Sequence, residues 1–138
     1  MSSTEAVIES AWDAPESVYD RGAPTYDAMV SSRLYNRLAW GTDPADYVAF
    51  AREAVGSGEG PLLDVAAGTA IATAGAYLAS ARPVVLTDRS KGMLDLATRR
   101  LTVDGRLRPD TRFVQADAFA LPFPPGGFET VLCLGFLH

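Results

Sequence analysis

The chain has 138 residues, a formal net charge of -5 and a hydrophobic content of 48%, which is the profile of one globular domain of ordinary composition. The excess of 17 acidic over 12 basic side chains argues against a nucleic-acid partner, because proteins that bind nucleic acid usually present a basic face. The single cysteine, Cys133, fits a reducing cytoplasmic setting, and the sequence gives no sign of a secretory leader or of a membrane span.

Residues 1–60 predict a helical segment. Pro24 is placed to open one helix, and a better-marked helix follows with Asp43 as its N-cap and Gly56 just past its end. The glycine-rich joint GSGEGP comes next. We therefore divide the chain into an N-terminal helical cap over 1–60 and a core over 61–138.

Beyond this joint, short apolar runs alternate with helical patterns. The strand candidates are PLLDV, PVVLTD, RFVQAD and ETVLCLG, and the helices between the first three are TAIATAGAYLASA and SKGMLDLATRRL, the latter capped by Ser90. Strands separated by helices form parallel sheets with right-handed crossovers and helices on both faces. The sequence therefore predicts an α/β fold.

Three acids stand at the ends of the first three predicted strands, and ligands of open parallel sheets bind beyond these carboxyl ends. Asp88 lies 20 residues after Gly68, the spacing of an acid that accepts hydrogen bonds from ribose hydroxyls. Asp117 can accept from an adenine amine, and Asp64 can hold an ammonium group directly or through water. Each acid alone is equally well explained as a turn former or helix cap, but together they indicate a nucleoside-bearing ligand.

The turn after the first strand has one glycine. Gly68 allows close approach of a ligand because it has no Cβ, whereas Ala66 and Ala70 occupy places where the dinucleotide fingerprint G-x-G-x-x-G requires glycine. A pyrophosphate needs close backbone contact at a helix N-terminus. A nicotinamide-binding Rossmann domain is therefore disfavoured.

The ordered motifs resemble those of the class I S-adenosylmethionine-dependent methyltransferases, and most of all the small-molecule group of ubiquinone and menaquinone biosynthesis C-methyltransferases. LLDVAAGTA is similar to their first motif, VVLTDRSKGML to the second, and FVQADAFALPFPPGGFETVLCLGFLH to the third and fourth. VYDRGAPTYD and LYNRLAWG are similar to the N-terminal helices that cover the cofactor. The resemblance spans nearly the whole chain, although Ala66 and Ala70 replace family glycines.

This resemblance implies a Rossmann-like methyltransferase fold with S-adenosylmethionine as cofactor. Asp64 and Gly68 would hold its methionine end and Asp88 its ribose. Met93 is equally well explained as a core residue of its helix. Tyr19 and Tyr26 are equally well explained as anchors of the N-terminal helices. The remaining cofactor contacts that the resemblance implies are Ala66, Arg89, Met93, Asp117, the Ala118 amide, Tyr19 and Tyr26.

The family sheet has seven strands in the order 3-2-1-4-5-7-6, of which this chain would form 3-2-1-4. The fourth strand, ETVLCLG, would then be an apolar edge, and such edges recruit other strands. We expect a homodimer or a partner chain to cover it, unless the chain is a fragment. His138, the only histidine, lies just beyond this strand and is the candidate general base, although a terminal histidine without a fixed role is the simpler reading.

The leading functional hypothesis is S-adenosylmethionine-dependent methyl transfer to a small molecule, with a second chain completing the substrate site. The alternative is a non-catalytic subunit that pairs through the fourth strand and stabilises or regulates a full-length methyltransferase. The three acids favour the first hypothesis, and the missing strands and Ala70 favour the second. The sequence leaves the acceptor and the methylated atom open, and it predicts no metal site.

Overall fold

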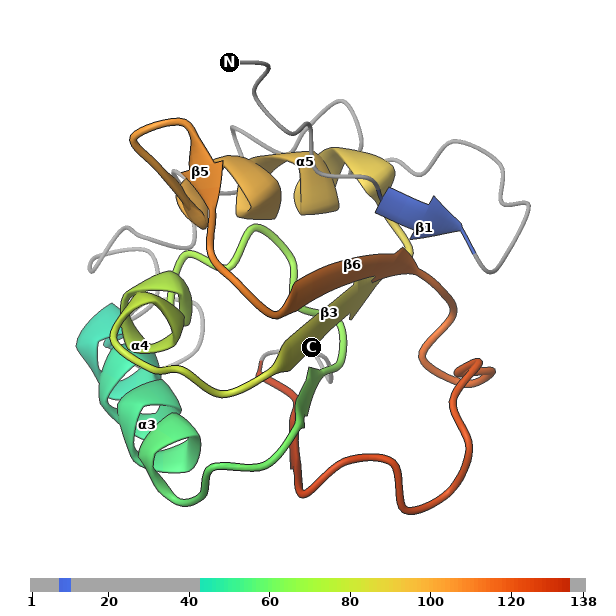
Figure 1. The fold of residues 1–138 in the computed structure, drawn as a ribbon, viewed down its shortest axis with the longest axis horizontal. Coiled ribbons are helices and arrows are strands. Elements are labelled where there is room, and N and C mark those ends of the chain that lie inside the picture. The colour runs from blue at the N-terminus through green and yellow to red at the C-terminus, as the bar shows by residue number, and fades with distance from the viewer. Residues whose placement is uncertain (1–7, 11–42, 135–138) are drawn as a thin grey trace.

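A five-stranded parallel sheet is the centre of the fold (Figure 1) in the computed structural model, which describes residues 8–10 and 43–134. The strand order is β1-β6-β3-β2-β7, and each neighbouring pair is parallel. The four strands predicted from the sequence therefore lie in the predicted order 3-2-1-4. The strands are β1 (Ile8–Ser10), β2 (Leu62–Asp64), β3 (Val84–Asp88), β6 (Thr111–Gln115) and β7 (Thr130–Leu132).

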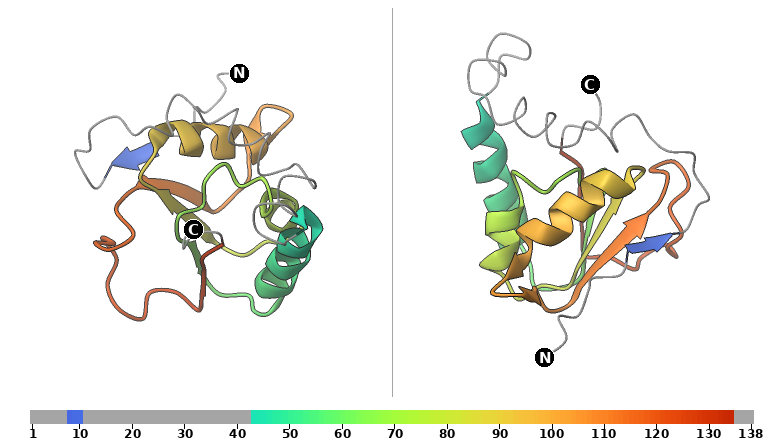
Figure 2. Two further views of the ribbon diagram at one scale, coloured as in Figure 1. Left: turned by 180° about the vertical axis from the view of Figure 1, so that it is seen from behind. Right: turned by 90° about the horizontal axis from the view of Figure 1, so that it is seen from above.

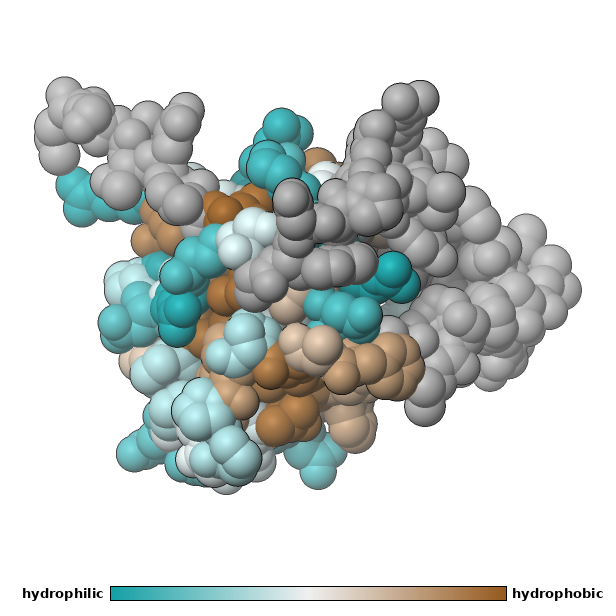
Figure 3. Space-filling model, turned by 90° about the vertical axis from the view of Figure 1, so that its right-hand side faces the viewer, coloured by the Kyte–Doolittle hydropathy of each residue, from teal (hydrophilic) through white to brown (hydrophobic). Residues whose placement is uncertain are grey.

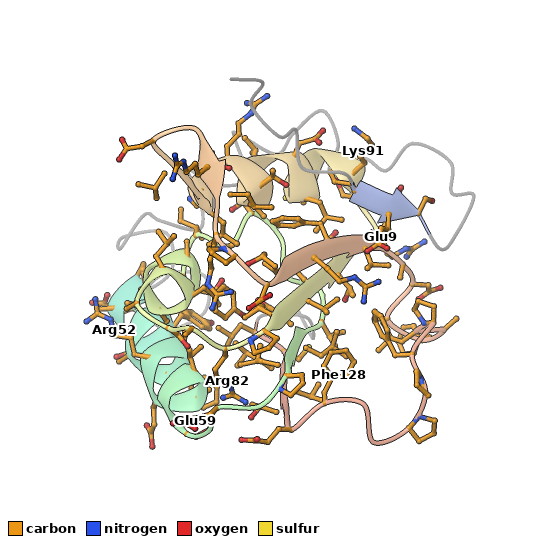
Figure 4. All side chains as sticks on the ribbon, in the orientation of Figure 1. Glu9, Arg52, Glu59, Arg82, Lys91 and Phe128 are labelled. Carbon is orange, nitrogen blue, oxygen red and sulfur yellow. The ribbon has the colours of Figure 1, made fainter. Side chains whose placement is uncertain are left out.

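β1 corrects the prediction that residues 1–60 form helices only. It pairs with the outer edge of β6, where Ile8 lies opposite Phe113. The Arg112 guanidinium donates to both carboxylate oxygens of Glu9, at 3.0 and 3.1 Å (Figure 4). Three residues are too few to show the alternation that predicts a strand from the sequence. They form a strand because they pair with the edge of β6. The helix predicted to open at Pro24 lies outside the described residues.

Helix α3 (Pro44–Gly56) confirms the better-marked N-terminal prediction. The Asp43 side chain accepts a hydrogen bond from the Ala45 amide at 2.9 Å, which satisfies one of the free N–H groups of the first turn. Asp46 completes a capping box. The helix includes Gly56 as its last residue, one residue further than predicted.

Helix α5 (Lys91–Arg100) is also confirmed, with the Ser90 hydroxyl accepting from the Met93 amide at 3.1 Å. Helix α4 (Ala74–Leu78) is much shorter than the predicted alanine-rich helix. Its expected first residues, 69–73, instead form turns in which Ala70 has the left-handed conformation, which a right-handed helix cannot continue.

A small antiparallel hairpin that was not predicted connects α5 to β6. Its strands are β4 (Thr102–Val103) and β5 (Arg106–Leu107). The turn between them has positive φ at Asp104 and Gly105, of 51° and 75°. These are the conformations that a two-residue type I′ turn requires, and Asp-Gly is a preferred sequence for it.

The three described helices pack on one face of the sheet, and the segment 116–129 covers the other (Figures 1 and 2). On the helix side, Val55 of α3, Tyr77 of α4 and Leu94 of α5 share one core with the strands. The opposite core is smaller and packs against loop residues. Within the described residues, the prediction of helices on both faces thus holds for one face only. The smaller core contains Leu63, Val65, Val85, Val114 and Ala116, with Leu121, Phe123 and Phe128 packed against it.

Two buried arginines donate hydrogen bonds to backbone carbonyls near the amino ends of the strands. Arg108 donates from Nε to the Tyr77 carbonyl at 2.6 Å and from Nη2 to the Ser80 and Arg82 carbonyls at 2.7 and 2.6 Å. Arg82, labelled in Figure 4, donates to the Gly60 carbonyl at 2.8 Å. Both guanidinium groups satisfy buried carbonyls between helices and strands, which makes them structural elements of this end of the molecule.

No described helix is long and apolar enough to cross a membrane. In the same part of the chain, no cluster of histidine, cysteine and acidic side chains is suited to hold a metal ion.

Candidate functional site

The carboxyl ends of β2, β3 and β6 bring the predicted acids to one edge of the sheet. Asp64 is the last residue of β2 and Asp88 the last of β3. The Ala116 amide donates to the Asp88 carbonyl at 3.0 Å. Asp117, the next residue, therefore follows β6 at the point where β3 ends. The topology predicted from the sequence therefore produces the predicted juxtaposition.

The turn after β2 has alternating left-handed residues. Ala66, Gly68 and Ala70 have φ of 54°, 59° and 59°, and these are the three places where the family resemblance predicts glycine or finds it. Alanine pays about 1–2 kcal/mol for this conformation. The two alanines therefore keep the backbone shape of the glycine loop, at a cost in stability.

Two hydrogen bonds fix this turn against the end of β3. The Ala67 amide donates to the Thr87 carbonyl at 2.8 Å, and the Gly68 amide donates to Asp88 Oδ2 at 2.9 Å. A Cβ added to Gly68 would meet no heavy atom within 4 Å among the described residues. Among the described residues, the backbone at Gly68 therefore leaves room for the close approach of a ligand.

Asp88 bridges two turns. Its Oδ2 accepts from Gly68, and its Oδ1 accepts from the Ser90 amide at 2.9 Å. An ionised carboxylate offers about four acceptor positions and no donor, so one such group can accept several hydrogen bonds at once. The arrangement orients the carboxylate at the half-buried sheet edge, where ribose hydroxyls can donate to it.

Asp64 is enclosed rather than open to the edge. Its side chain is 1% exposed and points to the helix side of the sheet, where the Tyr77 hydroxyl donates to Oδ2 at 2.6 Å. Burial raises the pKa of Asp64 to about 7, the Tyr77 hydrogen bond acts in the opposite direction, and the nearby charge of Asp88 raises it further. The sequence analysis missed Tyr77. The sequence feature that could have indicated Tyr77 is that it is an aromatic residue with a hydroxyl in a segment otherwise rich in alanine.

Asp117 and Ala118 lie in the loop that follows β6. Asp117 Oδ1 accepts from the Phe119 amide at 2.9 Å, which is the turn-forming role weighed for this residue from the sequence. Ala118 is half-buried and packs against the smaller core. Their roles toward adenine remain predictions.

Arg89 and Met93 differ in exposure. Arg89 is exposed, and its carbonyl accepts from the Gln115 side chain at 2.9 Å. Met93 is 3% exposed on α5, which agrees with the reading of this residue as part of the interior. The predicted contacts of Tyr19 and Tyr26 with the cofactor, and the predicted base His138, fall outside the described residues.

Two surface hollows, of about 730 and 570 Å³, lie away from the three acids. One is between α3 and α4, and the other is between the amino end of the sheet and the loop residues Phe123 and Phe128. Neither is lined by Asp64, Asp88 or Asp117. These two hollows are therefore separate from the candidate site at the ends of β2, β3 and β6.

A methyltransferase-domain family model matches residues 62–138. The match takes in more than half of the chain, including the left-handed turn and the three acids. The chain belongs to the methyltransferase-domain family. This confirms the resemblance to the class I S-adenosylmethionine-dependent methyltransferases.

Among individual proteins, the demethylmenaquinone methyltransferase of Clavibacter sepedonicus is 37% identical over 114 residues, which are 83% of this chain and 42% of that enzyme. The chain spans less than half the length of the curated relatives it matches.

Solved structures agree on the fold. A Methanococcus maripaludis protein assigned as an S-adenosyl-L-methionine-dependent methyltransferase superposes with a TM-score of 0.66 at 15% identity, covering 91% of this chain and 55% of that one. The complex of DhpI with SAH superposes with a TM-score of 0.57 at 25% identity, covering 83% and 48%. This methyltransferase-domain chain thus has the Rossmann-like fold of its family.

S-adenosylmethionine is the family cofactor, and the residues of the edge fit it chemically. Asp88 is an oriented hydrogen-bond acceptor of the kind that a ribose diol needs, and the described residues leave room at Gly68 for a close backbone approach. Asp64 supplies a carboxylate for a cationic group, provided that it is ionised. The turn lacks the glycines for a pyrophosphate, which S-adenosylmethionine does not contain.

Proposed function

We propose that this chain holds S-adenosylmethionine along the edge formed by the ends of β2, β3 and β6, for methyl transfer to a small-molecule acceptor. The observation that carries the proposal is the left-handed turn fastened to Asp88 by the 2.9 Å bond from the Gly68 amide. In this assignment Asp88 accepts from the ribose hydroxyls, Asp64 faces the methionine ammonium and Asp117 with the Ala118 amide binds the adenine.

When bound, the cofactor supplies a methyl group that its sulfonium already activates. The residues of this chain then orient the cofactor and exclude water, because an in-line displacement depends mainly on approach geometry. Where the acceptor must lose a proton, a base is needed, and His138 is the candidate from the sequence. The demethylmenaquinone methyltransferase relative makes a demethylated naphthoquinone the first acceptor to test.

We further propose that a strand from a second copy or from a partner chain covers the outer edge of β7 and helps to complete the substrate site. Within the described residues β7 pairs with β2 alone. Val131 of β7 is 62% exposed, and apolar residues gather on the side of the molecule that Figure 3 shows. An exposed apolar strand edge favours pairing with another strand.

Calorimetric titration with S-adenosylhomocysteine tests the cofactor site. The wild-type chain should bind saturably, and Asp88→Ala should weaken binding about 5- to 150-fold, because a buried ligand hydroxyl loses a charged acceptor worth about 1–3 kcal/mol. Asp95→Ala is the matched control, since Asp95 lies on the outer side of α5 beside Lys91. Equal affinity of wild type and Asp88→Ala would contradict the assignment.

Measurement of the molecular mass of the protein in solution tests whether another chain pairs with the edge of β7. Val131→Lys should dissociate an assembly that forms through β7, because it places a charge on the exposed face of the edge strand. Leu132 is unsuitable for this test, because it is 3% exposed and lies in the main core. A wild-type chain that is monomeric at all concentrations would contradict self-pairing.

The alternative is a non-catalytic subunit that stabilises or regulates a full-length methyltransferase. The exposed edge of β7 and the strained alanines of the turn favour it. Measurement of S-adenosylhomocysteine formation by the isolated chain, with and without a full-length relative, separates the two. Cofactor binding without turnover, together with a change in the relative's activity, would support the regulatory subunit.

A further inference from the structure

A buried pair, Asp64 and Tyr77, lies beneath the candidate site and joins β2 to α4. Tyr77 is fully buried and Asp64 is 1% exposed, and the phenol oxygen is 2.6 Å from Asp64 Oδ2. This short bond connects two side chains that are 13 residues apart. A buried carboxylate needs such a donor, because an unpaired charge in the protein interior is very costly.

The backbone of Tyr77 fixes the direction of its phenol. Its amide donates to the Thr73 carbonyl at 3.0 Å, and its carbonyl accepts from Arg108 Nε at 2.6 Å. The ring belongs to the main core together with Leu62. With its backbone bonded and its ring packed, Tyr77 can place its hydroxyl only within a narrow range, which suits a residue that orients a partner.

We propose that Tyr77 is a positioning residue of the cofactor site, whose hydroxyl holds Asp64 oriented and ionised so that the carboxylate can attract the cationic methionine end of the cofactor. The inference rests on the proposed function, since it assumes that Asp64 serves the cofactor. Tyr77 itself does not touch the ligand. It acts through Oδ2 of Asp64, and Oδ1 is the oxygen that the Tyr77 bond does not use.

The charged groups around Asp64 explain why the donor matters. Asp88, at the end of β3, opposes ionisation of Asp64, and so does burial. Partial desolvation and, to a smaller extent, the Asp64 charge raise the pKa of the Cys133 thiol just after β7. Arg108 acts on Tyr77 rather than on Asp64. The Tyr77 hydrogen bond is thus the stabilising influence on the Asp64 carboxylate from α4.

The test is S-adenosylhomocysteine affinity measured from pH 5.5 to 8.5 for wild type and Tyr77→Phe. Phenylalanine keeps the packed ring and removes the hydroxyl. We expect a loss of about tenfold in affinity near pH 7, and the pH below which binding weakens should rise by about one unit, because Asp64 then ionises less readily. Tyr47→Phe on the partly exposed side of α3 is the control, and it should leave both quantities unchanged.

The double variant Asp64→Asn/Tyr77→Phe separates positioning from packing. Once Asp64 is replaced by a neutral amide, removal of the Tyr77 hydroxyl should change the affinity of Asp64→Asn less than twofold, and neither the single nor the double variant should show the wild-type pH dependence. If Tyr77→Phe fails to fold while the double variant folds, the charged carboxylate requires its donor, which supports the proposal. If neither folds, the hydroxyl serves packing and the proposal is overturned.

Two results would overturn the inference while leaving the cofactor proposal intact. They are wild-type affinity in Tyr77→Phe and an affinity loss that is the same at every pH. Unchanged binding by Asp64→Asn would overturn the inference and also the assignment of Asp64 to the methionine ammonium, but it would leave the assignment of Asp88 to the ribose. Absence of binding by the folded wild-type chain is a different outcome, because it contradicts the proposed function itself.

Discussion

Replacement of Asp64 by asparagine should make the protein more stable above neutral pH. The pKa of Asp64 is about 7 in the folded chain, against 3.8 for an ordinary aspartate, so the folded state binds the proton more tightly than the unfolded state. The free energy of unfolding therefore falls as the pH rises from about 4 to 7. At ~1.4 kcal/mol for each pKa unit, the ceiling of this loss is about 4 kcal/mol. Asparagine has no charge to bury and can still accept from the Tyr77 hydroxyl.

Urea unfolding followed by circular dichroism, at pH 5 and pH 8.5, measures this difference. At pH 5, already above the ordinary pKa of an aspartate, Asp64→Asn should be more stable than the wild type by about 1–2 kcal/mol, and at pH 8.5 by about 4 kcal/mol. Asp95→Asn, on the exposed side of α5, should show no such trend. A stability difference between Asp64→Asn and wild type that is constant or shrinks with rising pH would refute the reasoning. The same variant should bind S-adenosylhomocysteine less well, so the acid would be kept for binding at a cost in stability.

Three further changes test separate features of the fold. Ala66→Gly and Ala70→Gly should each raise the free energy of unfolding by up to ~1 kcal/mol, since the left-handed strain exceeds the flexibility that glycine adds; a lower melting temperature would contradict this. Arg108→Met should cost about 3–5 kcal/mol in urea unfolding, because it leaves buried carbonyls without donors, and a loss below ~1 kcal/mol would show that water replaces the guanidinium. Glu9→Gln, which weakens the exposed pair with Arg112, should cost less than ~1 kcal/mol and lose its effect in about 1 M salt.

The sequence predicted the sheet well because its signals were local and agreed with one another. Four apolar runs separated by helical or turn patterns predicted the four strands and a parallel sheet. The order of the strands came from the resemblance to the methyltransferase family. The caps Asp43 and Ser90 marked their helices correctly, since capping depends on residues only two or three positions apart. The edge position of the acids followed directly from the parallel topology.

The features that were missed depend on contacts between distant parts of the chain. The strand β1 exists because β6 offers an open edge, about a hundred residues further along the chain. The pair of Tyr77 and Asp64 depends on how α4 packs over β2. The late start of α4, at Ala74 rather than residue 69, was also missed, although the left-handed conformation of Ala70 explains why no helix begins at the first predicted residues.

The bridge made by Asp88 also has a consequence for ligand selection. Its two oxygens are held by the amides of Gly68 and Ser90, so the carboxylate cannot swing away when a ligand arrives. A carboxylate held in this way can accept hydrogen bonds from the free hydroxyls of a sugar. It repels a sugar that carries a phosphate at the same place, because two anions would then meet at short range. If Asp88 binds the ribose as proposed, this edge should discriminate by charge against nucleosides that carry a phosphate on the same hydroxyls.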